Sequence, residues 1–241
     1  MDPQKAYRCR VQYALHLRDL ADKDYISARM SYRVDLTDQF LWSGLQALEK
    51  YLKATLLFNN LSTLKLSHHL DKAFQRLFDI KAAKFDFPPG MAEFIEYLGN
   101  YGNNRYWEFP SYTEGYELSY LDLSVWNVRR YCQPITDPKV CESLNGPEAM
   151  RNRHNIRLDG GFLESVLIEA RKKKLRVALV WKNGCYGSRS RDLIRNYPVR
   201  IVSTNPVQFR GPSCYPALKG YVQFPNDVKQ ELEQLASSAS E

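Results

Sequence analysis

The chain has 241 residues, enough to bury one full core or one core with an appended region. Hydrophobic residues make up 44% of it and charged residues 25%, which is the balance of a globular protein. No apolar run approaches the roughly 20 residues needed to cross a bilayer, and the first ten residues lack the apolar segment of a secretion signal. We therefore expect a cytoplasmic protein that makes no membrane contact.

The cysteines give no sign of a metal centre or of a disulfide framework. They are odd in number, scattered, without a CxxC pair, and no histidine stands at metal-ligand spacing from any of them. We therefore expect reduced thiols, no metal site and no cofactor. The five are Cys9, Cys132, Cys141, Cys185 and Cys214.

The positive charge is concentrated in one stretch of the chain. Residues 1–150 hold 18 Lys and Arg against 19 Asp and Glu, whereas residues 151–200 hold 13 against 4 and residues 201–241 hold 3 against 4. The formal excess of +9 therefore falls within fifty residues. Phosphate-backbone binding needs such a concentration, because each neutralised phosphate releases condensed counterions, although a solvated basic face gives the same count.

The clearest helical pattern covers residues 38–57, whose apolar side chains recur at steps of three and four. A preceding helix is predicted at roughly residues 22–35, and the two should pack as an antiparallel pair. Polar side chains such as Glu49, Lys50 and Lys53 should lie off the apolar face. The apolar face consists of Phe40, Leu41, Leu45, Leu48, Leu52 and Leu56.

Three more helices are predicted before residue 135, which makes five. Leu70 to Phe78 suggest a short helix with Ser67 as its N-cap, and Met91 to Leu98 suggest another. The third should cover roughly residues 113–132, with Pro134 just beyond its end. We expect an all-α fold, an antiparallel up-and-down bundle in residues 1–135.

Residues 136–241 are predicted to form a less regular basic extension with two or three helices. One helix should start at Phe162 and end in the run Arg171 to Lys174. Residues 177–181 fit either a buried helix or a short strand, and we favour the helix. Four prolines between residues 197 and 216 and a fifth at 225 indicate an extended arm, and residues 227–235 a short final helix.

Five sequence blocks, taken in order, resemble the HEPN family over roughly residues 18–135. The first two are DYISAR at 24–29 and QALEKYLKA at 46–54; the next two are SHHL at 67–70 and RYWEF at 105–109. The fifth is the helix that contains Leu121, Val125, Trp126, Arg129 and Arg130. No single block is specific, and the order and spacing of the five carry the resemblance.

The resemblance implies a helical bundle that commonly forms a homodimer. Family functions range from metal-independent ribonucleases to non-catalytic modules that bind nucleotides or partner proteins. Members are often paired with minimal nucleotidyltransferases in toxin–antitoxin systems. Catalytic members carry an arginine followed after four to six residues by a histidine; the histidine moves the proton of a ribose 2′-OH, and the arginine stabilises the phosphorane.

This chain departs from that catalytic motif. His154 follows Arg151 by only three residues and stands between Arg153 and Arg157, whose charges favour its neutral, basic form. The pair Arg10 and His16 has an allowed spacing but precedes the first matched helix, and chance supplies about one such match. Arg151 and His154 are therefore the candidate catalytic residues of a nonstandard site.

The sequence thus predicts a HEPN-like module that binds RNA or a nucleotide, in a toxin–antitoxin or defence setting, without an intact ribonuclease motif. Two alternatives stay open: a metal-independent ribonuclease, and a purely protein-binding subunit whose basic segment meets an acidic partner. The candidate nucleic-acid-binding residues are Arg151, Arg153, Arg157, Arg171, Lys172, Lys173, Lys174, Arg189 and Arg191.

Overall fold

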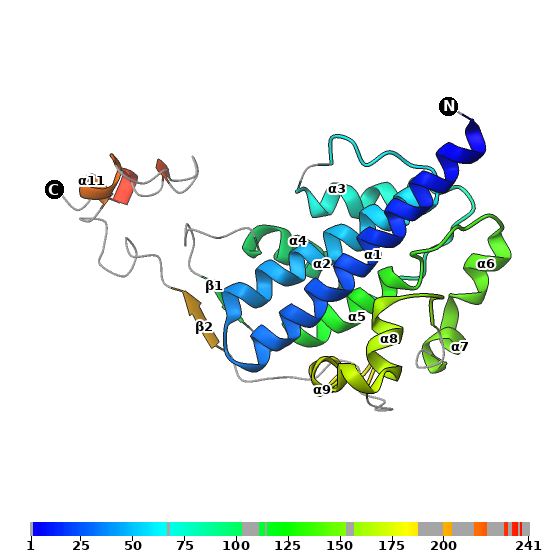
Figure 1. Cartoon of the computed structure of the whole chain (residues 1–241). Helices are drawn as coiled ribbons and strands as arrows, with labels where there is room; N and C mark the ends of the chain where they lie inside the picture. Colours follow the sequence, from blue (N-terminus) through cyan, green and yellow to red (C-terminus); the bar gives the residue numbers. More distant parts are fainter. Residues whose placement is uncertain are drawn as a thin grey trace.

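The computed structural model describes residues 2–66, 68–102, 111–113, 115–152, 157–187, 200–203, 215–220, 229–230, 233–235 and 237. The fold is all-α, as the periodicity predicted, with one short pair of strands (Figure 1). The helices are α1 (Pro3–Arg33), α2 (Thr37–Phe58), α3 (Leu70–Gln75), α4 (Met91–Tyr101), α5 (Glu117–Arg129), α6 (Pro138–Ser143), α7 (Gly146–Arg151), α8 (Phe162–Ile168), α9 (Lys173–Val180) and α11 (Tyr215–Leu218).

The two longest helices, α1 and α2, form an antiparallel pair (Figure 1). α1 is one helix of 31 residues and begins far before the predicted residue 22. Asp2 caps it by accepting a hydrogen bond from the Gln4 amide at 3.1 Å, and Pro3 occupies the first helical position. The turn to α2 reverses the chain at Asp35, whose φ of 62° lies in the left-handed region.

The core lies between α1, α2, α4 and α5. Leu45, Leu48 and Leu52 of α2 are fully buried there, as their spacing predicted. α5 is a central helix, since nearly all its side chains are buried. Glu49 was expected off the apolar face, but it is buried, and its carboxylate accepts a hydrogen bond from Lys53 at 2.5 Å.

The strand pair joins distant parts of the chain. β1 (Ser111–Thr113) pairs antiparallel with β2 (Arg200–Ser203), with a register shift after Ser111. β2 is extended, as predicted for this arm, whereas α5 starts at Glu117 and not at 113 because residues 111–113 are used in this pairing. Within the predicted Pro-rich arm the structure describes β2, α11 and the turn residues 219 and 220; most of the arm lies outside the described residues, as does Ser67.

The amide of Gly146 at the start of α7 donates to the Asp86 carboxylate at 2.9 Å, and α6 is held beside the end of α5 by a smaller apolar cluster. Its buried members are Tyr131, Ile135, Cys141 and Leu144. The ring of Tyr131 also packs edge-on against Phe85, with centroids 4.8 Å apart. α7 therefore has a fixed position in the fold, and Arg151 lies at its end.

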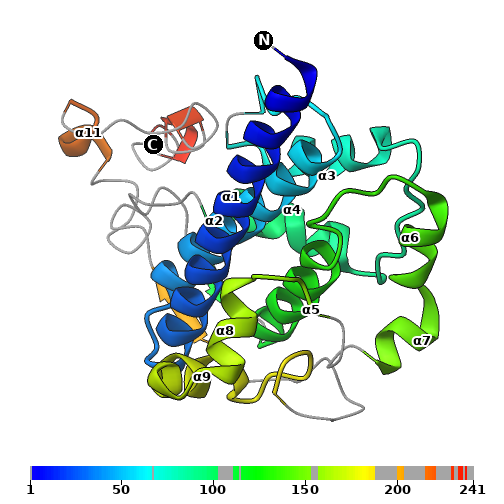
Figure 2. The ribbon, with the colours of Figure 1, turned by 45° about the vertical axis from the view of Figure 1, so that its right-hand side comes forward.

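Residues 158–187 pack into the same core as the first 135 residues. Leu163 and Val166 of α8 and Leu179 of α9 are fully buried there. Figure 2 shows α8 in front of α5, with α9 across the end of α1. The boundary predicted at residue 135 therefore does not separate two cores. The helix favoured for residues 177–181 is confirmed, but α8 ends at Ile168, and the basic run Arg171 to Lys174 leads into α9 through a short 3₁₀ turn.

Replacing Leu179 by Ala should lower the free energy of unfolding by about 2–5 kcal/mol, because the change leaves a cavity in the shared core. Denaturant titration followed by circular dichroism measures the effect, and the transition should stay single. Val177→Ala on the same helix is the matched control, since Val177 is 43% exposed. A second transition at lower denaturant, or equal losses in both variants, would show that α9 is not part of the core.

Candidate nucleic-acid interface

α1 carries a stripe of buried polar side chains on the face toward α5, α8 and α9. Arg18, Asp22, Tyr25 and Arg29 recur at steps of four, three and four, the spacing of a single helix face. None of them is more than 3% exposed. Because buried charges are costly without partners, this stripe dictates what packs against α1.

Asp22 is the centre of the first half of this buried network. Its carboxylate accepts hydrogen bonds from Tyr51 Oη at 2.5 Å, from Arg129 Nε at 2.7 Å and from the Leu163 amide at 2.9 Å. Arg129 also donates to both carboxylate oxygens of Glu164, at 2.7 and 2.6 Å. One carboxylate thus ties together α1, α2, α5 and α8.

The start of α8 is capped from α1. Its own N-cap residue, Gly161, offers no side chain, and the amides of Phe162 and Leu163 donate to Asp19 and Asp22. The negative carboxylates also suit the positive end of the helix dipole. Gly161 fits because a Cβ there would overlap the carboxylate of Glu164.

The end of α9 is capped from α1 as well. Arg29 Nε donates to the Ala178 carbonyl at 3.0 Å, and Nη2 donates to the carbonyl of Trp181. Its third nitrogen pairs with Asp122 of α5. A guanidinium at a helix C-terminus satisfies carbonyls that have no intrahelical partner and interacts favourably with the dipole.

Tyr25 completes the second half of the network. Its hydroxyl donates to Asp122 at 2.6 Å and accepts from Asn183 Nδ2 at 2.8 Å. Asn183 is fully buried, and its side-chain oxygen accepts from the amide of Cys185. The chain beyond α9 is therefore also anchored to α1.

Three groups of this network, Tyr25, Tyr51 and Arg129, keep their protons near neutral pH. Burial, and then the Asp122 and Asp22 carboxylates, raise the pKa of Tyr25 and Tyr51 well above the ordinary value. Burial alone would lower the pKa of Arg129, but Asp22 and Glu164 outweigh it and raise that pKa. The network therefore has a structural role: it holds α8 and α9 in place.

Most of the predicted nucleic-acid-binding residues that the structure describes gather where α8 meets α9. Arg171, Lys173 and Lys174 are exposed. Lys172 is half-buried; its amine donates to Ser165 Oγ at 2.5 Å and lies 4.9 Å from the ring centroid of Phe162.

The remaining predicted site residues are not all brought together. Arg157 is exposed at the start of the segment that leads to α8. Arg151 is exposed at the end of α7, which lies on the other side of α8 from α9 in Figures 1 and 2. Outside the described residues lie Arg153, His154, Arg189 and Arg191. Of the proposed catalytic pair, the structure therefore describes Arg151 and not His154.

Two of the three acidic residues of this region are paired with cations, and the third, Asp159, is exposed before the start of α8. Residues 157–187 contain seven Lys and Arg against three Asp and Glu. Glu164 is paired with Arg129 in the core, and Glu169 accepts from Arg171 at 2.5 Å and from Lys172 at 3.1 Å. The outer surface at the junction of α8 and α9 is therefore positive.

The lysines of α2 do not extend this positive surface. Lys50 pairs with Asp24 at 2.6 Å, and Lys53 pairs with Glu49 at 2.5 Å. Within the described ranges, no group of three His, Cys, Asp or Glu side chains is placed to hold a metal ion. The same residues include no helix with the length and apolar character needed to cross a membrane.

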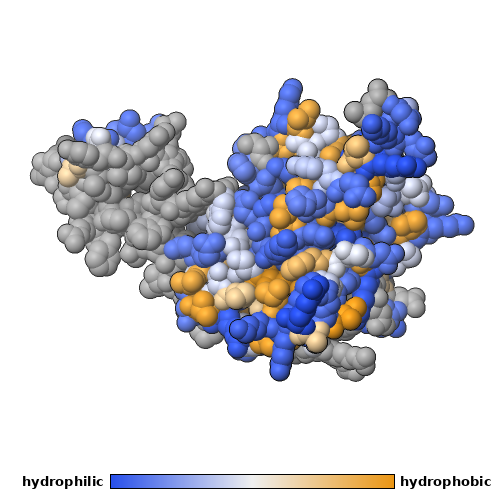
Figure 3. Space-filling model, viewed as in Figure 1, coloured by the Kyte–Doolittle hydropathy of each residue, from blue (hydrophilic) through white to orange (hydrophobic). Residues whose placement is uncertain are grey.

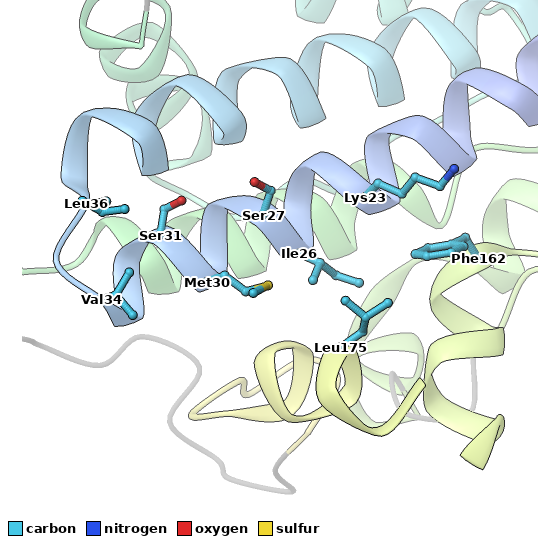
Figure 4. Close-up of a pocket in the computed structure, with 9 residues that line it drawn as sticks. All are labelled: Lys23, Ile26, Ser27, Met30, Ser31, Val34, Leu36, Phe162 and Leu175. Carbon is cyan, nitrogen blue, oxygen red and sulfur yellow. The ribbon is translucent and has the colours of Figure 1, made fainter. Parts of the chain in front are cut away.

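A groove of about 460 Å³ lies between α1 and the α8–α9 unit (Figure 4). In the figure, Met30 and Ile26 of α1 point toward Leu175 of α9, while Lys23 lies beside Phe162 of α8. No pattern in the sequence predicts this groove, because its walls come from segments more than a hundred residues apart. Its lining consists of Lys23, Ile26, Ser27, Met30, Ser31, Val34, Leu36, Phe162 and Leu175.

Comparison with known proteins gives no relative for this arrangement. No protein-family model, no curated protein and no solved structure matches the chain. The HEPN resemblance therefore stays a prediction, and the functional argument depends on the chain's own residues.

The buried pairing of Glu164 predicts a loss of stability in acid. Arg129 holds the pKa of Glu164 below its ordinary value in spite of burial. A carboxylate with a depressed folded pKa contributes stability above its unfolded pKa of about 4.3, and this contribution disappears as the pH falls through the folded pKa. Glu164→Gln should therefore be less stable than the parent by about 1–3 kcal/mol at pH 7, and the gap should narrow as the pH falls below about 4.3.

Denaturant midpoints from pH 7 to about pH 3 measure this gap. Glu142→Gln is the matched control, because Glu142 is exposed on α6 and its replacement should leave the curve unchanged. A gap that stayed constant over the whole range would mean that the Arg129–Glu164 pair does not carry the effect.

Proposed function

We propose that this chain binds RNA, by its phosphate backbone, on the cationic surface where α8 meets α9. The observation that supports the proposal is the exposed run of Arg171, Lys173 and Lys174, beside which Glu164 and Glu169 are already paired. Each exposed cation that meets a phosphate releases condensed counterions, which gives affinity without base recognition.

The rigidity of this surface favours a binding role. α8 and α9 are short, and their ends are capped by Asp22 and Arg29 of α1, so the cations have a fixed position on the bundle. A preorganised charged surface loses less freedom on binding than a flexible tail does. The HEPN resemblance points to the same class of ligand, RNA or nucleotide.

The ribonuclease alternative has less support among the described residues. Arg10 and His16 both lie on α1, and six residues of helix turn them to different sides. His154 lies outside the described residues, so the test below also measures cleavage.

The cellular setting that the resemblance implies is part of the proposal. We place the chain in the cytoplasm, a reducing compartment in which the free thiols of Cys132 and Cys141 persist. A homodimer and a minimal nucleotidyltransferase partner in a toxin–antitoxin or defence system stay predictions.

Replacing Lys173 and Lys174 by Ala should weaken binding to single-stranded RNA by about tenfold at low salt, because two phosphate contacts are lost. The slope of log affinity against log salt should become shallower by about 1.4, since each contact to a single strand contributes roughly 0.7. Fluorescence anisotropy of labelled RNA in EDTA, between about 0.05 and 0.2 M NaCl, measures both quantities.

The charge-matched control is Lys65→Ala with Lys72→Ala, which removes two exposed cations from the α3 side of the bundle. Equal losses in the two double variants would contradict the assigned surface. Gel analysis of the same samples reports cleavage, and RNA cleaved by the parent but left intact by His154→Ala would establish the ribonuclease instead.

A further inference from the structure

Three large apolar side chains are exposed in the groove between α1 and α9, beside the candidate interface. Met30 is 48% exposed, Val34 63% and Leu36 57%, and all three line the groove. Figure 3 shows hydrophobic side chains gathered over this end of α1 and beside α9, with hydrophilic ones around them. A grouped apolar surface with a polar rim is typical of a protein interaction site.

The groove has the shape of a helix-docking surface. Ile26, Met30 and Val34 follow one another at four-residue steps, so they form a stripe about 12 Å long on one side of α1. Leu175 and Phe162 form the opposite wall. Two to three turns of a partner helix would cover this length, and Met side chains adapt well to a partner's surface.

The rim of the groove is positive. Lys23 and Lys172 lie 5.4 and 4.9 Å from the ring centroid of Phe162, and exposed Lys173 and Lys174 follow at the start of α9. Two carboxylates near these lysines are already engaged: Asp24 pairs with Lys50, and Glu169 pairs with Arg171 and Lys172.

From these features we propose that the groove docks an amphipathic helix of a partner protein, with an apolar stripe and acidic flanks. The acidic flanks complement Lys23 and Lys172, and the apolar stripe covers Met30, Val34 and Leu36. This interaction goes beyond RNA binding and does not require it.

Two other occupants fit the groove less well. An RNA base would find Ser27 and Ser31 as its few polar partners, and the Phe162 ring on which it would stack already has two ammonium groups against it. A second copy joined groove to groove would set the same cations against each other.

Methionine methyl signals provide a direct test on the full-length chain. The chain has four methionines; Met30 lies in the groove and Met91 is 1% exposed in α4, so the second serves as an internal reference. The probe is a synthetic helical peptide of about four turns with a leucine stripe flanked by glutamates. Its addition should move the Met30 methyl signal and leave the Met91 signal in place.

Matched variants and peptides distinguish docking in the groove from non-specific binding. Val34→Glu should weaken peptide binding by about tenfold or more, the loss expected for a charge at the centre of an interface. Leu64→Glu should leave it unchanged, because Leu64 is 78% exposed on the far side near α3. A peptide with lysines in place of its glutamates should bind about tenfold more weakly or worse.

The proposal is overturned if the acidic peptide leaves the Met30 signal unmoved, if Leu64→Glu weakens binding as much as Val34→Glu, or if the lysine peptide binds equally well. It is also overturned if RNA, or a rise in protein concentration, moves the Met30 signal where the peptide does not; the groove then belongs to a base or to a second copy. RNA affinity of Val34→Glu is read separately, so a failed groove leaves the phosphate-binding proposal standing.

Discussion

The carboxylate of Asp22 is the constraint on which the rest of the structure depends. It is fully buried, and a buried charge must be paired and hydrogen-bonded. Its partners come from α2, α5 and α8, so satisfying this one group sets how three elements meet α1. Arg129 extends the constraint to Glu164, which brings the region after residue 157 into the same core. The apolar side chains supply the bulk of the driving force, and these polar contacts select one arrangement among those that would bury the same area.

The capping of α8 and α9 links this network to the surface. Both helices are short, seven and eight residues, and helices of that length are marginal without tertiary support. Asp22 supports the first and Arg29 the second. The α1–α2 pair therefore also holds in place the positive run that leads into α9. It holds one wall of the groove in the same way. A surface built this way can present phosphate-binding cations and an apolar stripe side by side, for two kinds of partner.

The sequence predicted the parts of the fold that follow from apolar spacing: the all-α class, the α1–α2 pair and the helix at residues 177–181. It did not predict the length of α1, because Arg18, Asp22 and Arg29 fall at core spacing yet read as solvent-facing charges, which hides the buried face. For the same reason, Glu49 was expected off the apolar face, although it is buried. The basic run was visible in the charge count, but its pairing with Glu169 and the groove beside it depend on contacts between segments far apart in the chain.

Because Asp22, Arg129 and Glu164 satisfy one another, substitutions at these positions are not independent. Loss of Arg129 would leave two buried carboxylates uncompensated, so a lineage that replaced it would also have to replace Asp22 and Glu164. Exposed residues of the other helices make no such buried pairs, so they can be substituted one at a time. The lasting signature of this fold is therefore an acid on α1, an arginine at the end of α5 and a second acid near the start of α8, whatever the lengths of the loops between them.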